Sequence, residues 1–253
     1  KVDYTPVYGD AIDLQRFAEI GKKGVLALMS DSTNAERPGF TQSERTVGAT
    51  FDRLFAEHSN TRIIVATFAS NVDRVQQIIN TSYKYGRKVV VEGRSMVNII
   101  SVASELGYLN VPENTLIETD QLKNYPREKT TIITTGSQGE SMAALSRMAA
   151  DVHRKVTIMP GDTIIFSSNP IPGNEKSVSK VINELTAKGA NVIFQDAHVS
   201  GHACQEELKL IYSLVKPKYA IPVHGEYRHL KANAGIARML GIPKDNIFIL
   251  KSG

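Results

Sequence analysis

The sequence has little cysteine and no long apolar run. Its single cysteine, Cys204, excludes an internal disulfide bond and is typical of a reducing compartment. No apolar stretch approaches the ~20 residues that a membrane-spanning helix requires, and the first residues carry no signal-peptide pattern. We therefore expect a cytoplasmic protein that has no contact with a membrane.

Common enzyme motifs are also missing. The 253 residues contain neither a Walker A loop nor a dinucleotide-binding fingerprint, and they contain no Gly-x-Ser-x-Gly nucleophile elbow. The net charge of +4 is compatible with a polyanionic partner such as nucleic acid but does not require one. Composition alone therefore leaves the function open.

What the sequence does contain is a regular alternation of strand and helix patterns. Segments rich in Val and Ile, such as 62–67 and 88–92, alternate with amphipathic segments such as 72–85. Strands that are apolar on both faces indicate a parallel sheet covered by helices on both sides, and thus an α/β fold. Further strands are expected at 25–29, 130–135, 155–158, 163–166, 191–194 and 219–223, and further helices at 12–20, 96–106, 141–150, 178–188 and 205–215.

A capping-box pattern predicts one more helix. Thr41 is followed three residues later by Glu44, and Val47, Phe51 and Leu54 continue a helical stripe. We therefore expect Thr41 to cap the amino end of a helix.

Histidines gather near the carboxyl end of the sequence. His198 and His202 flank a Ser-Gly pair, and His224 ends a short apolar strand. If the strands that lead to these two loops lie side by side, both loops meet at the carboxyl edge of a parallel sheet, where open α/β sheets place their chemistry. Alone, these histidines do not define a metal site. The remaining histidines are interpreted as solvated surface residues: His58, His153 and His229.

Two other strand ends carry residues that suit a charged ligand. Asp31 follows an apolar strand, where a carboxylate can orient a histidine or bind a cation, although an Asx-turn is the commoner role. In the loop 136–140, backbone N–H groups and the Ser137 hydroxyl can bind a phosphate, but an ordinary tight turn fits equally well. Cys204 is expected to pack as a small apolar residue.

Four segments together resemble the β-CASP nucleases of the metallo-β-lactamase superfamily, and most closely the bacterial ribonuclease J family. They are 28–34, 135–140, 200–202 and 223–226. The resemblance covers essentially the whole chain. It implies a β-CASP domain with a Rossmann-like parallel sheet at 38–197, inserted in the carboxyl-terminal part of a metallo-β-lactamase αββα fold that supplies 1–37 and 198–253.

The resemblance also implies a role for each site residue. Asp31 matches the acidic residue of motif A and His202 the histidine of motif B. This pair is expected to be catalytic, with His202 protonating the leaving oxygen or stabilising charge there. His224 matches motif C, which in the family ligates one of two zinc ions, with Mn or Mg as alternatives. The implied phosphate-binding residues are Ser137, Gln138, Gly139, His198, Ser200, Gly201 and His202.

The implied activity is that of a metal-dependent ribonuclease in RNA processing and decay. The family combines 5′-to-3′ exonuclease and endonuclease activity, with two cations that polarise the phosphodiester. The implied partners are RNA, preferably 5′-monophosphorylated, and a second copy or a paralogue of the subunit.

One departure from the family pattern is a missing motif. The family's His-x-His-x-Asp-His motif occurs nowhere in the sequence. The metal site is then incomplete, because the single imidazole of His224 does not hold a catalytic cation tightly. We therefore expect a fragment that lacks the amino-terminal metal-binding half and the carboxyl-terminal domain, and that hydrolyses RNA poorly or not at all by itself.

Two alternatives remain open at this point. One is a non-catalytic module that binds RNA or phosphate, either as a truncation or as the inactive partner subunit of an active nuclease. The other is a β-CASP metalloenzyme that acts on DNA, which the segments 135–140 and 200–202 disfavour.

Overall fold

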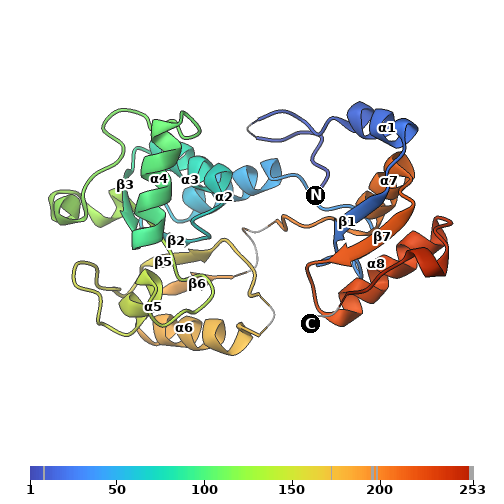
Figure 1. The fold of residues 1–253 in the computed structure, drawn as a ribbon. Helices are drawn as coiled ribbons and strands as arrows, with labels where there is room; N and C mark the ends of the chain where they lie inside the picture. Colours follow the sequence, from blue (N-terminus) through green and yellow to red (C-terminus); the bar gives the residue numbers. More distant parts are fainter. Residues whose placement is uncertain (8, 172, 195–196, 198, 251–253) are drawn as a thin grey trace. The chain divides into compact units, whose positions relative to one another are not determined.

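The structure is a computed structural model. It describes residues 1–7, 9–171, 173–194, 197 and 199–250. The chain divides into two compact units, whose elements are labelled in Figure 1. The first unit comprises Lys1–Glu44 and Val199–Gly253, and the second comprises Arg45–His198. The second unit is thus inserted into the sequence of the first.

The second unit is built on a parallel sheet of five strands. They are β2 (Ile63–Ala66), β3 (Lys88–Glu92), β4 (Thr130–Thr134), β5 (Thr163–Phe166) and β6 (Asn191–Ile193). Their order across the sheet is β3-β4-β2-β5-β6. The central strands β4, β2 and β5 are buried along their whole length, which is typical of a sheet covered on both faces. The predicted α/β fold with a parallel sheet is therefore confirmed.

The helices of the second unit cover both faces of this sheet. They are α2 (Arg45–Glu57), α3 (Val72–Lys84), α4 (Arg94–Glu105), α5 (Ala144–Ala149) and α6 (Glu175–Ala187), with the 3-10 helices η1 (Thr119–Asn124) and η2 (Arg127–Lys129). In Figure 1, α2 and α3 lie over one face, and α5 and α6 lie over the other. Leu145 of α5 and Leu185 of α6 pack with Ile132 of β4 in one apolar core.

The first unit is organised around a pair of parallel strands. The strands are β1 (Ala27–Asp31) and β7 (Tyr219–Val223), and the helices are α1 (Leu14–Lys23), α7 (Gln205–Val215), α8 (Tyr227–Met239) and the 3-10 helix η3 (Lys244–Asn246). Tyr212 of α7 and Ile236 of α8 pack with Ala220 of β7. In the pairing register Asp31 lies opposite Val223. The carboxyl ends of both strands therefore meet at one edge.

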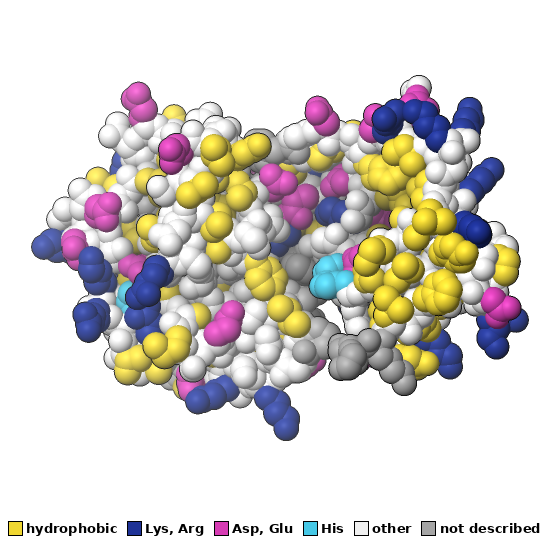
Figure 2. Space-filling view, viewed as in Figure 1, with side chains coloured by type: hydrophobic (Ala, Val, Ile, Leu, Met, Phe, Trp, Pro, Cys, Tyr) yellow, Lys and Arg dark blue, Asp and Glu magenta, His cyan; other side chains and the backbone are white. Residues whose placement is uncertain are grey.

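Apolar side chains are exposed on and next to the β1–β7 pair. Leu26 is 70% exposed and Met29 is 67% exposed, and Phe248 and Leu250 are exposed as well. Figure 2 shows hydrophobic side chains gathered over this part of the first unit. A two-stranded sheet is marginally stable without further packing. Among the helices that the structure describes, none is both long and apolar enough to cross a membrane.

Most elements lie within three residues of their predicted bounds, but one predicted strand is absent. Residues 155–158 form no strand, although Val156 and Ile158 are buried in the core of the second unit. Apolar side chains at alternate positions can pack against a core while the backbone pairs with no strand. The strand prediction was therefore wrong.

The predicted capping role of Thr41 is also wrong. Helix α2 begins at Arg45, four residues later. The backbone N–H of Thr41 donates to Glu207 Oε2 at 2.7 Å, and its hydroxyl donates to the carbonyl oxygen of His202 at 2.6 Å. Thr41 therefore holds the loop that carries His202.

Two histidines that were interpreted as surface residues are buried. The Nε2 atom of His153 lies 3.3 Å from Glu92 Oε2, and its Nδ1 accepts the backbone N–H of Val156 at 3.1 Å. His229 is only 6% exposed. The surface interpretation was wrong because both rings have polar partners inside the fold, and hydrogen bonding removes much of the cost of burial.

The strand beside β7 is β1, and not a strand that leads to the first histidine loop. Strand β6, which precedes that loop in sequence, belongs to the sheet of the second unit. The expected meeting of two histidine-bearing strands is therefore wrong. His202 instead lies in the loop that leads into α7.

Candidate active site

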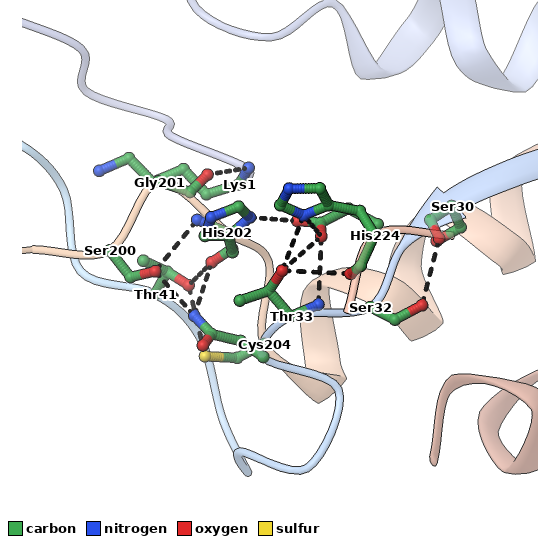
Figure 3. Close-up of polar contacts among 12 residues, drawn as sticks. Lys1, Ser30, Ser32, Thr33, Thr41, Ser200, Gly201, His202, Cys204 and His224 are labelled. Atoms are coloured by element: carbon green, nitrogen blue, oxygen red, sulfur yellow. Dashed lines mark hydrogen bonds and ion pairs between the residues drawn. The ribbon is translucent and has the colours of Figure 1, made fainter. Parts of the chain in front are cut away.

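Three ionisable side chains meet at the carboxyl edge of the β1–β7 pair. Asp31 is the last residue of β1, and His224 directly follows the last residue of β7. The third side chain is that of His202. The rings of His202 and His224 stack with their centroids 5.1 Å apart and an interplanar angle of 21° (Figure 3).

The carboxylate of Asp31 contacts both imidazole rings, each through a different oxygen. Its Oδ2 atom lies 2.6 Å from His202 Nδ1, and its Oδ1 atom lies 3.2 Å from His224 Nδ1. In both rings the nitrogen that faces Asp31 is Nδ1. The Nε2 atoms of both histidines are therefore turned away from the carboxylate.

The electrostatics of Asp31 fix the form of the His202 ring. Partial burial opposes ionisation of the Asp31 carboxyl, but hydrogen bonds from His202 and Thr33 outweigh it and hold its pKa well below its usual range. An ionised carboxylate only accepts hydrogen bonds. His202 Nδ1 therefore carries the hydrogen, and Nε2 is the ring atom that can accept or release a proton.

Thr33 ties the aspartate to the second histidine. Its backbone N–H donates to Asp31 Oδ1 at 3.1 Å, which is the geometry of an Asx-turn. Its hydroxyl oxygen lies 3.0 Å from the same Asp31 oxygen, 2.9 Å from His224 Nδ1 and 3.2 Å from the His224 carbonyl oxygen. The two roles considered for Asp31, a turn and the orientation of a histidine, are thus present together.

His224 occupies a backbone conformation that is uncommon for residues other than glycine. Its φ angle of 56° lies in the left-handed region, which costs an L-residue about 1 kcal/mol or more. Gly225 follows with a φ angle of 153°. Such strain persists only where surrounding contacts impose it, and it is frequent at functional sites.

The loop that carries His202 is held by buried polar residues. Asn34, which is buried, donates its amide to Ser200 Oγ at 2.8 Å and to the His202 carbonyl oxygen at 3.2 Å. The N–H of His202 also donates to Ser200 Oγ, at 3.1 Å. Because the Ser200 oxygen accepts both bonds, its own O–H can donate to another group.

Glu207 fastens the segments around this loop. Its side chain is fully buried and accepts three backbone N–H groups, from Val2 at 2.6 Å, Thr41 at 2.7 Å and Cys204 at 2.7 Å. Hydrogen bonds to a carboxylate are the strong class. Cys204 itself is buried, as expected for a small apolar packing residue.

The glycine-rich loop 136–140 belongs to the second unit, at the carboxyl end of β4. Ser137 and Gln138 are both buried. The Gln138 amide donates to the Asn169 carbonyl oxygen at 2.9 Å, and its Oε1 atom accepts the N–H of Ile171 at 2.6 Å. The Gln138 side chain is thus engaged in holding the loop that contains Asn169 and Ile171.

Both the backbone conformation and the close packing at position 139 require glycine. Its φ angle is 71°, and an added Cβ would lie 2.4 Å from the backbone carbon of Ser177.

His198, which was predicted to bind phosphate, lies outside the described residues. The structure therefore brings Asp31, His202 and His224 together, whereas Ser137, Gln138 and Gly139 form a separate loop in the other unit.

The three clustered side chains suit a divalent cation. Asp31, His202 and His224 each offer one ligand atom, and these atoms lie within 4.8 Å of one another. Imidazole nitrogen and carboxylate oxygen are both ligands that zinc accepts, but the facing atoms of Asp31 and His202 are engaged in their mutual hydrogen bond. His224 has an exposed side chain and keeps its Nε2 atom free of Asp31.

Sequence reasoning missed the residues that hold this cluster in place. Thr33 and Asn34 lie directly after the Asp31 turn, so their polar character was a usable signal. Thr41 was assigned to a helix cap, and nothing in its local pattern indicated the His202 loop. Asn233 is fully buried and lies against the turn after β1, but an asparagine inside a helical pattern is ordinarily a surface residue.

Comparison with known proteins gives a consistent family. Residues 60–185 match the family model of the ribonuclease J beta-CASP domain, and residues 190–244 match that of the Zn-dependent metallo-hydrolase RNA specificity domain. The chain is 54% identical to ribonuclease J 1 of Streptococcus pyogenes over 256 aligned residues, which cover all of this chain and 45% of that protein. It is 46% identical to ribonuclease J2 of Bacillus subtilis, again along its whole length and over 46% of that protein.

Other matches agree. Ribonuclease J of Thermus thermophilus is 44% identical over the whole chain, which covers 44% of that protein. A crystal structure of a protein of unknown function from Enterococcus faecalis superposes with a TM-score of 0.61 and 19% identity, over 94% of this chain and 52% of that one. This last likeness shows the fold alone. The chain spans less than half the length of these curated relatives. With two family models along its sequence and relatives 44% to 54% identical over the whole of this chain, the chain belongs to the ribonuclease J family of β-CASP nucleases.

Proposed function

We propose that Asp31, His202 and His224 are part of the centre of a metal-dependent ribonuclease with 5′-to-3′ exonuclease and endonuclease activity in RNA processing and decay. The observation that carries this proposal is the 2.6 Å hydrogen bond between Asp31 and His202, next to the stacked ring of His224. The relatives named ribonuclease J support it.

In this proposal Asp31 and His202 together transfer a proton to the leaving oxygen. The ionised Asp31 carboxylate keeps the hydrogen of His202 on Nδ1 and fixes the ring orientation. A protonated Nε2 atom can then donate its proton to the leaving oxygen of the cleaved phosphodiester. Asp31 also stabilises the positive charge that His202 carries before that transfer.

His224 is proposed as a metal ligand. Thr33 and Asp31 both contact its Nδ1 atom, so Nε2 has the free lone pair. Orientation of a ligating histidine through its second nitrogen is a general feature of metal sites. A divalent cation, when bound, would polarise the phosphodiester and provide hydroxide near neutral pH. We propose zinc, two ions in the whole enzyme, with Mn or Mg as alternatives.

Two loops are proposed to bind phosphate groups of the RNA, with a preference for a 5′-monophosphate. In the first unit these are Ser200, Gly201 and His202, where the Ser200 O–H can donate to an anion. His198 belongs to the same proposal. In the second unit Ser137 and Gly139 have this role, while Gln138 acts through the Asn169 loop that it holds.

Several properties of the whole protein follow as proposals. The β-CASP domain is assigned to 38–197 and the metallo-β-lactamase parts to 1–37 and 198–253. The protein is proposed to act in the cytoplasm and to associate with a second copy or a paralogue. We also propose that the segment of 253 residues hydrolyses RNA poorly by itself. Apolar side chains on and next to the β1–β7 pair are exposed, and few side chains are available to bind a metal ion. Both observations are consistent with a segment of a larger enzyme.

The test compares cleavage of a 5′-monophosphorylated oligoribonucleotide by the 253-residue chain and by a longer protein that contains it. The longer protein should cleave RNA with added Zn²⁺ or Mn²⁺, and His202→Ala and His224→Ala should each abolish cleavage. His58→Gln, outside the site, is the matched control. Robust cleavage by the 253-residue chain that His224→Ala removes would refute the expected inactivity of the segment.

The same experiment tests the alternative that the protein is a non-catalytic module that binds RNA. If the longer protein binds the oligoribonucleotide but cleaves it with none of Zn²⁺, Mn²⁺ and Mg²⁺, a non-catalytic RNA-binding module describes it better. A parallel oligodeoxyribonucleotide separates RNA from DNA recognition, provided that both are measured at the same salt concentration.

A further inference from the structure

Helix α8 presents an unusual pair of polar side chains to the interior of the first unit. His229 is 6% exposed and Asn233 is 0% exposed. They are four residues apart, so they lie one above the other on the same face of the helix. That face also carries the core residues Ile236 and Ala237. Buried polar groups on such a face need partners, and the partners found here are the two turns of the site.

Asn233 holds the turn that contains Asp31. Its Nδ2 atom lies 3.3 Å from the Ser30 carbonyl oxygen, 3.2 Å from the Asp31 carbonyl oxygen and 2.9 Å from Ser32 Oγ. Its Oδ1 atom accepts the hydroxyl of Tyr212 at 3.0 Å, which fixes the direction in which the amide hydrogens point. Asn233 thus forms hydrogen bonds to the residues on both sides of Asp31 and to the Asp31 backbone itself.

His229 holds the turn that contains His224. Its Nδ1 atom accepts the backbone N–H of Glu226 at 3.1 Å, two residues after His224. An added Cβ at Gly225 would lie 3.0 Å from His229 Cβ and 3.3 Å from its Nδ1, so the turn packs closely on this ring. Because Nδ1 accepts, the hydrogen of His229 is on Nε2, the nitrogen that faces Glu36 Oε2 at 3.6 Å.

We propose that His229 and Asn233 are positioning residues that together set the spacing between Asp31 and His224. One rigid helix holds both turns, and the turns are joined directly by the Ser32 N–H, which donates to the His224 carbonyl oxygen at 3.3 Å. This arrangement also accounts for the left-handed backbone of His224, which surrounding contacts must impose. The inference rests on the proposed function only in that the positioned pair belongs to its centre.

The test uses His229→Ala, which removes the acceptor for Glu226, and Asn233→Ala, which removes the amide. Ile236→Ala is the matched control, because it lowers stability from the same helix face through an apolar side chain that forms no hydrogen bond to either turn. The first readout is the ring ¹⁵N resonances of His202 and His224 in the metal-free protein, at a temperature where every variant is folded. The second is kcat and KM for RNA cleavage by the longer protein that contains the chain.

We expect both polar variants to displace the ring resonances of His202 and His224, whereas Ile236→Ala leaves them in place. Loss of a residue that orients a site group typically costs about 10- to 100-fold in activity, and this loss should fall on kcat with KM retained. His229→Gln, whose side-chain oxygen can still accept from Glu226, should recover most of the loss.

The proposal fails if the ring resonances stay at their wild-type positions while the melting temperatures of His229→Ala and Asn233→Ala drop as in Ile236→Ala. If Asn233→Ala does not fold, Tyr212→Phe takes its place, since it frees only the Asn233 amide to rotate and should displace the Asp31 turn to a smaller extent. Displaced resonances in a protein that cleaves no RNA would uphold the positioning role and reject the proposed function.

Discussion

Asp31 and His202 are joined by a 2.6 Å hydrogen bond between a carboxylate oxygen and Nδ1, across 171 positions of sequence. The same carboxylate reaches His224 with its other oxygen, at 3.2 Å. One aspartate therefore contacts both the proposed proton-transfer group and the proposed metal ligand. Its removal should affect both.

The first expected outcome concerns the charge of Asp31. Asp31→Asn keeps the size of the side chain but removes the ionised acceptor for His202 Nδ1, so the ring loses the fixed tautomer. By analogy with other aspartate–histidine pairs, the kcat of RNA cleavage should fall about 10²- to 10⁴-fold. Steady-state kinetics of the longer protein on a 5′-monophosphorylated RNA measure this. A variant with wild-type kcat would show that Asp31 does not orient the catalytic ring.

A second outcome concerns Thr33. Thr33→Val removes the hydroxyl next to His224 Nδ1 with little change in shape, and it should weaken Zn²⁺ binding about 10- to 100-fold. Thr33→Ser keeps the hydroxyl and should bind Zn²⁺ nearly as the wild type does. Isothermal titration with Zn²⁺ gives both affinities. Equal affinity for the Val and Ser variants would contradict the orienting role of the hydroxyl.

A third outcome separates structure from ligand binding at Gln138. Its amide makes two hydrogen bonds to the backbone of the 169–171 loop, and leaving such buried groups unpaired costs about 1–3 kcal/mol each. Gln138→Ala should therefore lower the free energy of unfolding in urea by a few kcal/mol. The exposed Gln15→Ala is the control and should be nearly neutral. If Gln138→Ala retains full stability but loses phosphate binding, Gln138 contacts the ligand directly.

A fourth outcome is a pH dependence of stability at high pH. Burial raises the pKa of Tyr212 to about 12, above the value of about 10 for an unfolded tyrosine. The contribution of Tyr212 is therefore fully present below pH 10 and is lost as the pH rises towards 12, because the unfolded chain releases its proton first. Unfolding in urea at pH 9 and at pH 11 measures the change. Tyr212→Phe should show a smaller loss between the two, and an equal loss would contradict the assignment.

Much of the fold follows from patterns of short range. The bounds of β3, β5, β7 and α7 agree with the residues predicted from apolar runs and helical spacing. Strand and helix periodicity are local properties, so the sequence carries them directly. The strand predicted at 155–158 fails because a buried apolar segment is not a strand until its backbone finds a partner.

The residues of the candidate site also fall into a predicted group and an unpredicted group. The resemblance to the family predicts Asp31, His202 and His224 as site residues, and the structure brings the three together. The residues that hold them were not identified, because Thr41 and Asn233 act on partners 161 and 202 positions away. A single sequence has no pattern that links such distant positions, and a buried polar residue in a helix looks like a surface one.

The pairing of β1 with β7 has a consequence for the order of events during synthesis. Ala27 of β1 is paired with Tyr219 of β7, and the whole second unit is translated between them. Domains tend to fold as units while the chain emerges from the ribosome. The inserted unit can therefore fold while β1 is still unpaired. An unfinished chain that has not reached His202 lacks the Asp31 hydrogen bond altogether. A nascent polypeptide still attached to the ribosome, itself made largely of RNA, therefore carries no assembled centre until translation has passed His224.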